Sequence, residues 1–170
     1  MDTPTPAGPT EPTETTGPTA QTAGFDALLD SARDVAQRAY APYSGFRVGA
    51  AGLADDGRTV TGCNVENAGY GVTLCAECGL VSELIAGGGG KLEKFVCVNG
   101  DGEVIMPCGR CRQLLAEHAS PQFRILTPLG ERTLDAVLPQ AFGPADLDDP
   151  AAADPAGPAA AERRTEGDPS

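Results

Sequence analysis

Apolar residues recur at helical spacing in three stretches of the chain, residues 25–40, 76–86 and 108–118. Side chains three and four positions apart would form one apolar stripe along each predicted helix. Pro42 is expected to stop the first helix, and the glycine run Gly87–Gly90 to end the second. A short helix or turn is predicted for residues 134–142.

Strands are predicted where apolar and polar residues alternate or where a short apolar run occurs, at residues 46–53, 58–65, 94–99, 123–127 and 131–133. Asp55-Asp56-Gly57 is a typical hairpin turn between the first two strands. Residues 66–74 have two glycines and no clear period, and are predicted to form a loop. This order of elements predicts an α/β fold with a mixed sheet of about five strands and helices on its faces.

The two ends of the chain differ from its middle in composition. Residues 1–23 are mostly Thr, Pro, Ala and Gly, and residues 144–170 are rich in Ala, Pro, Asp and Glu. Both ends have little apolar surface to bury, so they are predicted to be disordered tails. Residues 24–143 are then expected to form one folded domain.

The formal net charge of -12 is unevenly distributed. The tails carry more than half of it, which leaves a mildly acidic middle without a Lys/Arg cluster. This charge argues against binding to nucleic acid, including an RNA- or DNA-editing role, and against an anionic membrane surface. No apolar run approaches the ~20 residues of a membrane span, and no signal peptide is recognisable, so a cytoplasmic protein is expected.

Four of the six cysteines form two C-x-x-C pairs, Cys75/Cys78 and Cys108/Cys111. This clustering favours metal ligation in a reducing compartment over disulfides. Each pair begins where a predicted loop enters a predicted helix, and a helix N-terminus stabilises thiolates. Two alternative zinc sites fit this cysteine spacing: a closed Cys₄ structural site, or an open site with Cys75, Cys108 and Cys111 as ligands.

Glu77 favours the open site. A carboxylate would be unfavourable next to a closed cluster of four thiolates, whereas two residues after Cys75 it can reach water at an open zinc position. C-x-E followed by P-C-x-x-C is the signature of zinc nucleobase deaminases, in which the glutamate moves protons to the ring nitrogen and the departing amine. A non-catalytic binding module with a Cys₄ zinc site remains the alternative from a different functional class.

Further motifs extend the pattern, and with them the chain closely resembles the small, homotetrameric cytidine deaminases. The resemblance runs from about Ala39 to Phe142. Its motifs, in order, are Ala41-Pro42-Tyr43-Ser44, Phe46, Val48-Gly49-Ala50-Ala51, Gly62-Cys63-Asn64-Val65-Glu66-Asn67, Tyr70-Gly71, Cys75-Ala76-Glu77, Pro107-Cys108-Gly109, Cys111-Arg112-Gln113, Leu138-Pro139 and Ala141-Phe142.

The resemblance implies the three-layer cytidine-deaminase-like fold, a Zn²⁺ ion and pyrimidine salvage. The reaction would be hydrolytic deamination of cytidine and 2′-deoxycytidine to uridine and 2′-deoxyuridine. The resemblance also implies a homotetramer in which neighbouring subunits complete each pocket. Tyr70 and Phe142 would supply these neighbour contacts, although Phe142 could instead cap the core of its own subunit.

The same resemblance implies the substrate contacts. Asn64 and Glu66 should bind the ribose, with the Glu66 carboxylate accepting from the 3′-hydroxyl. Residues at i and i+2 leave a strand on one face, which agrees with this pairing. Phe46 should pack on the pyrimidine ring, but the pattern fits an ordinary core residue equally well. The backbone N–H of Ala76 should bind the carbonyl oxygen of the base.

Two positions depart from the usual family pattern. The family most often has an arginine after Cys-Ala-Glu, where this chain has Cys78, and a small residue between the paired cysteines, where this chain has Arg110. We hypothesise that Arg110 supplies the missing positive charge, with a solvated surface arginine as the alternative. Cys78 is predicted to be a buried small residue. Blasticidin-S deaminase shares both departures, so a nucleoside-antibiotic deaminase is the runner-up; the intact Asn64–Asn67 motif favours plain nucleosides.

Overall fold

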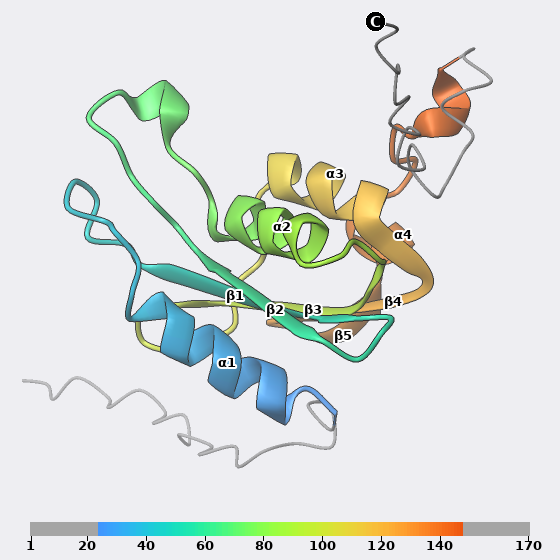
Figure 1. The fold of residues 1–170 in the computed structure, drawn as a ribbon, viewed down its shortest axis with the longest axis horizontal. Helices are drawn as coiled ribbons and strands as arrows, with labels where there is room; N and C mark the ends of the chain where they lie inside the picture. Colours follow the sequence, from blue (N-terminus) through green and yellow to red (C-terminus); the bar gives the residue numbers. More distant parts are fainter. Residues whose placement is uncertain (1–23, 148–170) are drawn as a thin grey trace, which may run out of the picture.

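A five-stranded sheet with the strand order β2-β1-β3-β4-β5 forms the middle layer of the computed structural model, which describes residues 24–147 (Figure 1). Helix α1 covers one face, and α2 and α3 cover the other. The elements are α1 (Asp26–Ala36), β1 (Val48–Ala54), β2 (Thr59–Cys63), a 3-10 helix (Tyr70–Val72), α2 (Ala76–Ala86), β3 (Leu92–Asn99), α3 (Gly109–His118), β4 (Ala119–Thr127), β5 (Gly130–Thr133), α4 (Leu134–Val137) and a second 3-10 helix (Pro144–Asp146). The predicted three-layer α/β fold is confirmed.

The sheet is mixed. Strand β1 is antiparallel to both β2 and β3, β3 and β4 are parallel, and β4 and β5 are antiparallel. The parallel pair is joined through α3, because parallel neighbours need a crossover connection. The predicted hairpin turn connects β1 to β2, with Gly57 at a φ of 86°.

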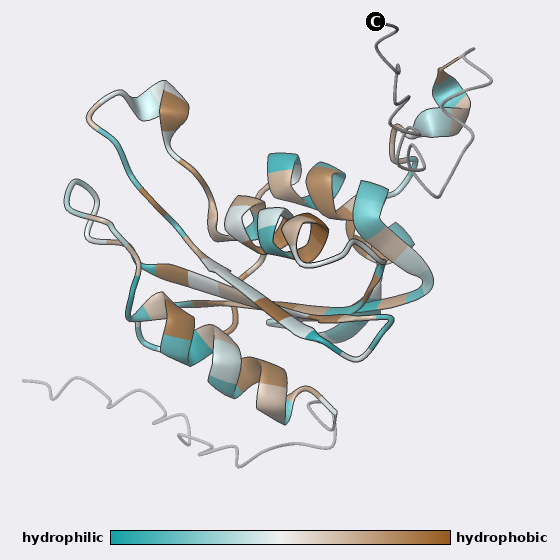
Figure 2. Ribbon diagram, in the orientation of Figure 1, coloured by the Kyte–Doolittle hydropathy of each residue, from teal (hydrophilic) through white to brown (hydrophobic). Residues whose placement is uncertain are grey.

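Strands β1 and β3 are buried on both faces, since helices cover both sides of the sheet. Ala51, Val96 and Val98 pack against α1, and the alternate residues face α2 and α3. Figure 2 shows hydrophobic residues of α1 on the side toward the sheet. Small apolar residues therefore fill both faces of β1. The alternation in the sequence predicts instead that the two faces would differ in polarity.

Close helix packing depends on glycine in the sheet. A Cβ atom on Gly62 of β2 would lie 2.2 Å from the carbonyl oxygen of Ala76 and 2.4 Å from the backbone nitrogen of Leu80. Helix α2 therefore rests directly on the β2 backbone. This contact positions the first turn of α2, which carries the candidate chemistry.

Most predicted boundaries agree with the structure to within about two residues, and the bounds of α2 agree fully. The first helix ends at Ala36 instead of continuing to Tyr40, because Tyr40 pairs with Val65 in an isolated bridge. Strand β4 begins at Ala119, four residues earlier than predicted, where Ala119 pairs with Leu92. The predicted loop 66–74 contains the 3-10 helix Tyr70–Val72.

Val65 also pairs with Leu74, so the three segments around Tyr40, Val65 and Leu74 lie side by side. This small ladder leads directly into Cys75. Both predicted tails lie outside the described residues, except for residues 144–147. None of the helices within residues 24–147 is long and apolar enough to cross a membrane.

Candidate active site

Three cysteines meet where α2 and α3 begin. Cys75 is the N-cap residue of α2, Cys108 is the N-cap residue of α3, and Cys111 lies in the first turn of α3. Their sulfur atoms all lie within 4.8 Å of one another. Sulfurs around a tetrahedral zinc with Zn–S bonds of about 2.3 Å are about 3.8 Å apart, so the three side chains fit such an ion.

The three thiols differ in their surroundings, and their pKa values shift in different directions. Burial raises the pKa of both Cys75 and Cys111. Hydrogen bonding, led by the backbone N–H of Cys111, lowers the pKa of Cys108. Three thiolates this close together would need a cation to offset their charge, and a soft divalent metal suits this donor set.

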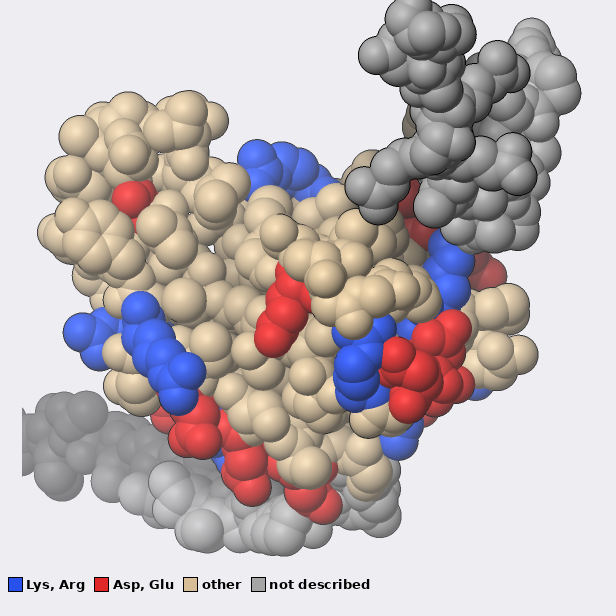
Figure 3. Space-filling model, viewed as in Figure 1, with Lys and Arg blue, Asp and Glu red and all other residues tan. Residues whose placement is uncertain are grey.

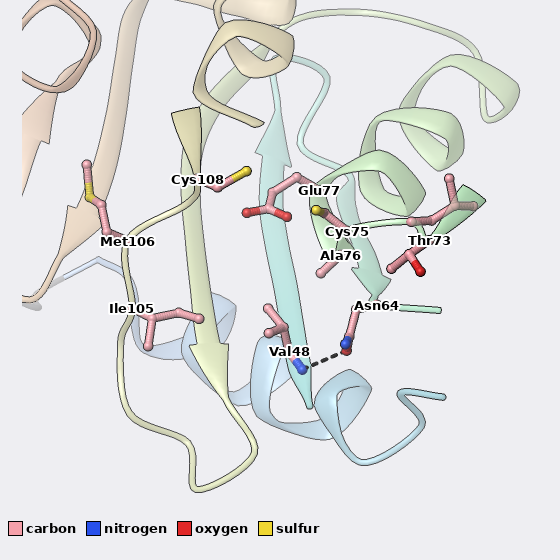
Figure 4. Close-up of a pocket in the computed structure, with 10 residues that line it drawn as sticks. Val48, Asn64, Thr73, Cys75, Ala76, Glu77, Ile105, Met106 and Cys108 are labelled. Atoms are coloured by element: carbon pink, nitrogen blue, oxygen red, sulfur yellow. Dashed lines mark hydrogen bonds between the residues drawn. The ribbon is translucent and has the colours of Figure 1, made fainter. Parts of the chain in front are cut away.

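Glu77 lies in the first turn of α2 and is 4% exposed. Figure 4 shows its carboxylate directed between the side chains of Cys75 and Cys108. No ion pair within residues 24–147 includes Glu77. A buried carboxylate without a cationic side chain is costly unless it binds a proton, water or a metal-bound group. This placement suits a group that exchanges protons inside a pocket.

A pocket of about 220 Å³ opens over this cluster (Figure 4). Its lining combines polar and sulfur-containing groups with apolar ones: Val48, Asn64, Thr73, Leu74, Cys75, Ala76, Glu77, Ile105, Met106 and Cys108. Asn64 is held by two hydrogen bonds, because its Oδ1 accepts from the Val48 N–H at 2.8 Å and its Nδ2 donates to the Phe46 carbonyl at 2.9 Å. The Asn64 side chain therefore links the pocket wall to the start of β1.

Glu66 does not line this pocket. Its carboxylate accepts hydrogen bonds from the backbone N–H groups of Tyr43 at 2.9 Å and Ser44 at 3.2 Å, and from the Ser44 hydroxyl. The Ser44 hydroxyl is the main cause that lowers the pKa of Glu66, with the two backbone N–H groups adding to it. Glu66 is thus an ionised acceptor, tied to the turn that precedes β1.

Phe46 lies at the end of that turn with 54% of its surface exposed. The alternative prediction, an ordinary core residue of the strand, is therefore wrong, since β1 begins two residues later at Val48. Its ring is free to contact a ligand or another chain.

Tyr70 and Phe142 are also exposed, by 79% and 57%. The exposure of Phe142 argues against its alternative, a cap on the core of its own subunit. Tyr70 packs edge-on against Tyr43 with ring centroids 6.4 Å apart. The loop between β2 and α2 that carries Tyr70 projects from the body of the protein, and the face shown in Figure 3 is almost free of charge there.

Arg110 donates from Nη2 to the sulfur of Cys78 at 3.1 Å. The pKa of Arg110 is raised, first by Cys78 and then by Cys75 and Cys111. Arg110 is exposed, and its guanidinium contacts Cys78 at the edge of the cysteine cluster. Cys78 is half-buried, less than predicted, and lies outside the group of three sulfurs that could hold a metal ion within the described residues.

Several contacts at the site do not follow from the sequence pattern. Gln113 donates from Nε2 to the Phe142 carbonyl at 2.7 Å, and Arg112 donates from Nη1 to the Val137 carbonyl at 2.6 Å. Ser44 is part of a motif without a predicted role, although serine is a frequent turn-forming residue. For the pocket-lining Ile105 and Met106, the local sequence gives no comparable signal.

Comparisons with known proteins agree with this geometry. The matching family model is the cytidine and deoxycytidylate deaminase zinc-binding region, which covers residues 25–127. The cytidine deaminase of Mycobacterium tuberculosis is 54% identical over 123 residues, spanning 72% of this chain and 92% of that protein. The cytidine deaminase of Sporosarcina psychrophila is 37% identical over 125 residues, spanning 71% and 92%.

A solved structure gives the same result for the fold. The crystal structure of cytidine deaminase from Mycobacterium leprae matches with a TM-score of 0.67 and 53% sequence identity, covering 69% of this chain and 98% of that one. The family match extends over more than half of this chain, and the relatives are matched over nearly their full length. The chain therefore belongs to the cytidine and deoxycytidylate deaminase family.

Proposed function

We propose that this protein is a hydrolytic deaminase of cytidine and 2′-deoxycytidine that uses a zinc ion held by Cys75, Cys108 and Cys111. One observation carries this proposal: the buried Glu77 lines the same pocket as Cys75 and Cys108, whose sulfurs lie within 4.8 Å of each other and of the Cys111 sulfur. A structural zinc site needs no such carboxylate and no pocket. A hydrolytic site needs both.

When bound, zinc supplies the Lewis acidity that makes water reactive near neutral pH. Glu77 would accept a proton from water and deliver it to the ring nitrogen of the base, while the water oxygen adds to the carbon that bears the amino group. Glu77 would then carry the remaining proton of the added hydroxyl to the amine, so that ammonia leaves and the carbonyl of the uracil ring forms. Burial of Glu77 keeps these transfers between substrate and carboxylate.

The substrate is held from two sides. The backbone N–H of Ala76 lies in the first turn of α2, where amides have no partner within the helix, and it would donate to the carbonyl oxygen of the base. Asn64 would contact the ribose from the pocket wall, and Glu66 would accept from the 3′-hydroxyl. The exposed ring of Phe46 would pack on the pyrimidine.

Tyr70 and Phe142 would complete the pocket of a neighbouring subunit in a homotetramer. Their exposure supports this role, because aromatic residues are enriched in protein–protein interfaces. Residues 67–74 contain no Asp, Glu, Lys or Arg. The assembly would act in the cytoplasm, in pyrimidine salvage.

Two alternatives are less well supported. For a Cys₄ structural module, Cys78 would have to join the cluster, but its sulfur accepts a hydrogen bond from Arg110 instead. A blasticidin-S-like antibiotic deaminase shares the Arg110 position, but the 54% identical relative is named cytidine deaminase. Plain nucleosides are therefore the favoured substrates.

The first experiment measures zinc per chain and cytidine turnover for the wild type and for Glu77→Gln. The expected result is about one zinc per chain in both proteins, turnover in the wild type, and loss of turnover in the variant. Zinc without cytidine turnover in the wild type would favour the antibiotic or the structural alternative. Unchanged turnover in Glu77→Gln would exclude Glu77 as the proton carrier.

A further inference from the structure

The Ser44 hydroxyl joins two of the side chains that are expected to contact the nucleoside. It donates to Oε1 of Glu66 and accepts from the backbone N–H of Phe46 at 2.9 Å. A serine hydroxyl has one donor proton, and here that proton is committed to the carboxylate. The direction of the hydroxyl is thereby defined from both sides.

The hydrogen bonds of Glu66 leave little capacity for any other contact. An ionised carboxylate has about four acceptor sites. Oε2 accepts from the backbone N–H groups of Tyr43 and Ser44, and Oε1 accepts from the Ser44 hydroxyl. About one acceptor site remains, on Oε1, the same oxygen that Ser44 orients.

From these contacts we propose that Ser44 is a positioning residue for substrate recognition. It presents Oε1 of Glu66 to a hydroxyl group of the nucleoside sugar, and it also fixes the backbone conformation at Phe46. The proposal rests on the proposed function, because it takes Glu66 as the partner of the 3′-hydroxyl. Since Glu66 can only accept, the matching group on the sugar must be a donor.

The lowered pKa of Glu66 supports this arrangement, because its main cause is the Ser44 hydroxyl. A carboxylate that stays ionised accepts more strongly from a neutral hydroxyl than a protonated one does. Without the Ser44 hydroxyl, Oε1 would lose its orienting partner, and the Phe46 N–H would lose its acceptor. Loss of a hydrogen bond to a charged group typically weakens binding about tenfold.

The test compares steady-state kinetics of wild type, Ser44→Ala and Ser44→Thr with cytidine and with 2′,3′-dideoxycytidine, which lacks the 3′-hydroxyl. Ser44→Ala is expected to raise KM for cytidine about tenfold with little change in kcat, since the lost contact is present in both ground and transition states. For dideoxycytidine the effect is expected to be clearly smaller. Ser44→Thr, which keeps the hydroxyl, is expected to restore most of the cytidine KM.

Ser31→Ala is the matched control, because the Ser31 hydroxyl donates only to the Ala27 carbonyl on the exposed side of α1. Ser31→Ala is expected to leave KM and kcat unchanged with both substrates. An equal loss with both substrates in Ser44→Ala, or a failure of Ser44→Thr to restore KM, would overturn the inference while the proposed function stands. Absence of cytidine turnover in the wild type would overturn both.

Discussion

The cysteine side of the pocket, around Cys75 and Cys108, differs from the loop side, formed by the segments around Tyr40, Val65 and Leu74. The difference lies in how completely a single chain forms each side. Cys75, Cys108 and Cys111 begin two helices that pack on the sheet, and Glu77 beside them is buried. On the loop side, aromatic side chains remain more than half exposed. The packing of a single chain therefore suffices to assemble the candidate metal site, whereas the loop side presents surfaces that need a ligand or another subunit.

The difference has a structural cause. The cysteine side is anchored by direct contact of α2 with the β2 backbone at Gly62. The loop side is held by isolated bridges between Tyr40, Val65 and Leu74 and by the hydrogen bonds of Glu66. Hydrogen bonds on an exposed surface stabilise a loop much less than a buried packing contact does.

Removing a ligand sulfur should have the largest effect on the cysteine side. Cys111→Ser is expected to lose nearly all bound zinc and all turnover, because only two thiolates remain. Cys78→Ala is the matched control and should keep about one zinc per chain, since its sulfur lies outside the cluster. Metal analysis after dialysis measures both. Loss of zinc in Cys78→Ala would restore the Cys₄ alternative.

A methyl group added on the cysteine side should destabilise the protein much more than a methyl group added on the loop side. Gly62→Ala is expected to lower the free energy of unfolding by about 3 kcal/mol or more, because α2 would have to move away from β2. Gly71→Ala is the control, since a Cβ there meets nothing within 4 Å, and its effect should stay within about 0.5 kcal/mol. Urea unfolding of both variants tests this, and equal stabilities would contradict it.

The same division explains what could be predicted from the sequence. The bounds of α2 and the grouping of its N-cap cysteine with Cys108 and Cys111 follow from local signals, a helical period and ligand spacing. The contacts of Glu66, Gln113 and Arg110 depend on where segments distant in the sequence meet. The local periodicity of the sequence does not predict such long-range contacts. The exposure of Phe46 likewise depends on β1 beginning at Val48, a boundary that alternation alone places two residues earlier.

Phe142 offers a test of whether the loop side is completed by another subunit. Phe142→Ala is expected to lower kcat/KM about tenfold through loss of an aromatic contact. If that contact crosses to a neighbour, refolding a mixture of Phe142→Ala and Glu77→Gln chains should restore part of the activity, because some pockets would combine an intact Glu77 with an intact Phe142.

Leu129→Ala is the control for this experiment, since Leu129 is an exposed apolar residue on the turn between β4 and β5. It should leave kcat/KM unchanged. A mixture with no more activity than its two components would show that Phe142 acts within its own subunit.

Arg110 acts on the cysteine cluster from its exposed edge. Three thiolates on Zn²⁺ leave a net negative charge, and a guanidinium close to them offsets it. Arg110→Ala is expected to weaken zinc retention and turnover by about tenfold. Arg110→Lys should recover only part of this loss, since an ammonium keeps the charge but not the planar donor geometry.

Arg132→Ala, on the exposed strand β5, serves as the charge-matched control and should match the wild type. Zinc retention against a competing chelator and cytidine turnover are measured on the same samples. Because Arg110 contacts Cys78 directly, Cys78→Ala should shift turnover in the same direction as Arg110→Ala, but by less. Near-normal turnover in Arg110→Ala would mean that two helix N-termini alone offset the charge of the thiolates, and that the cysteine side needs no arginine.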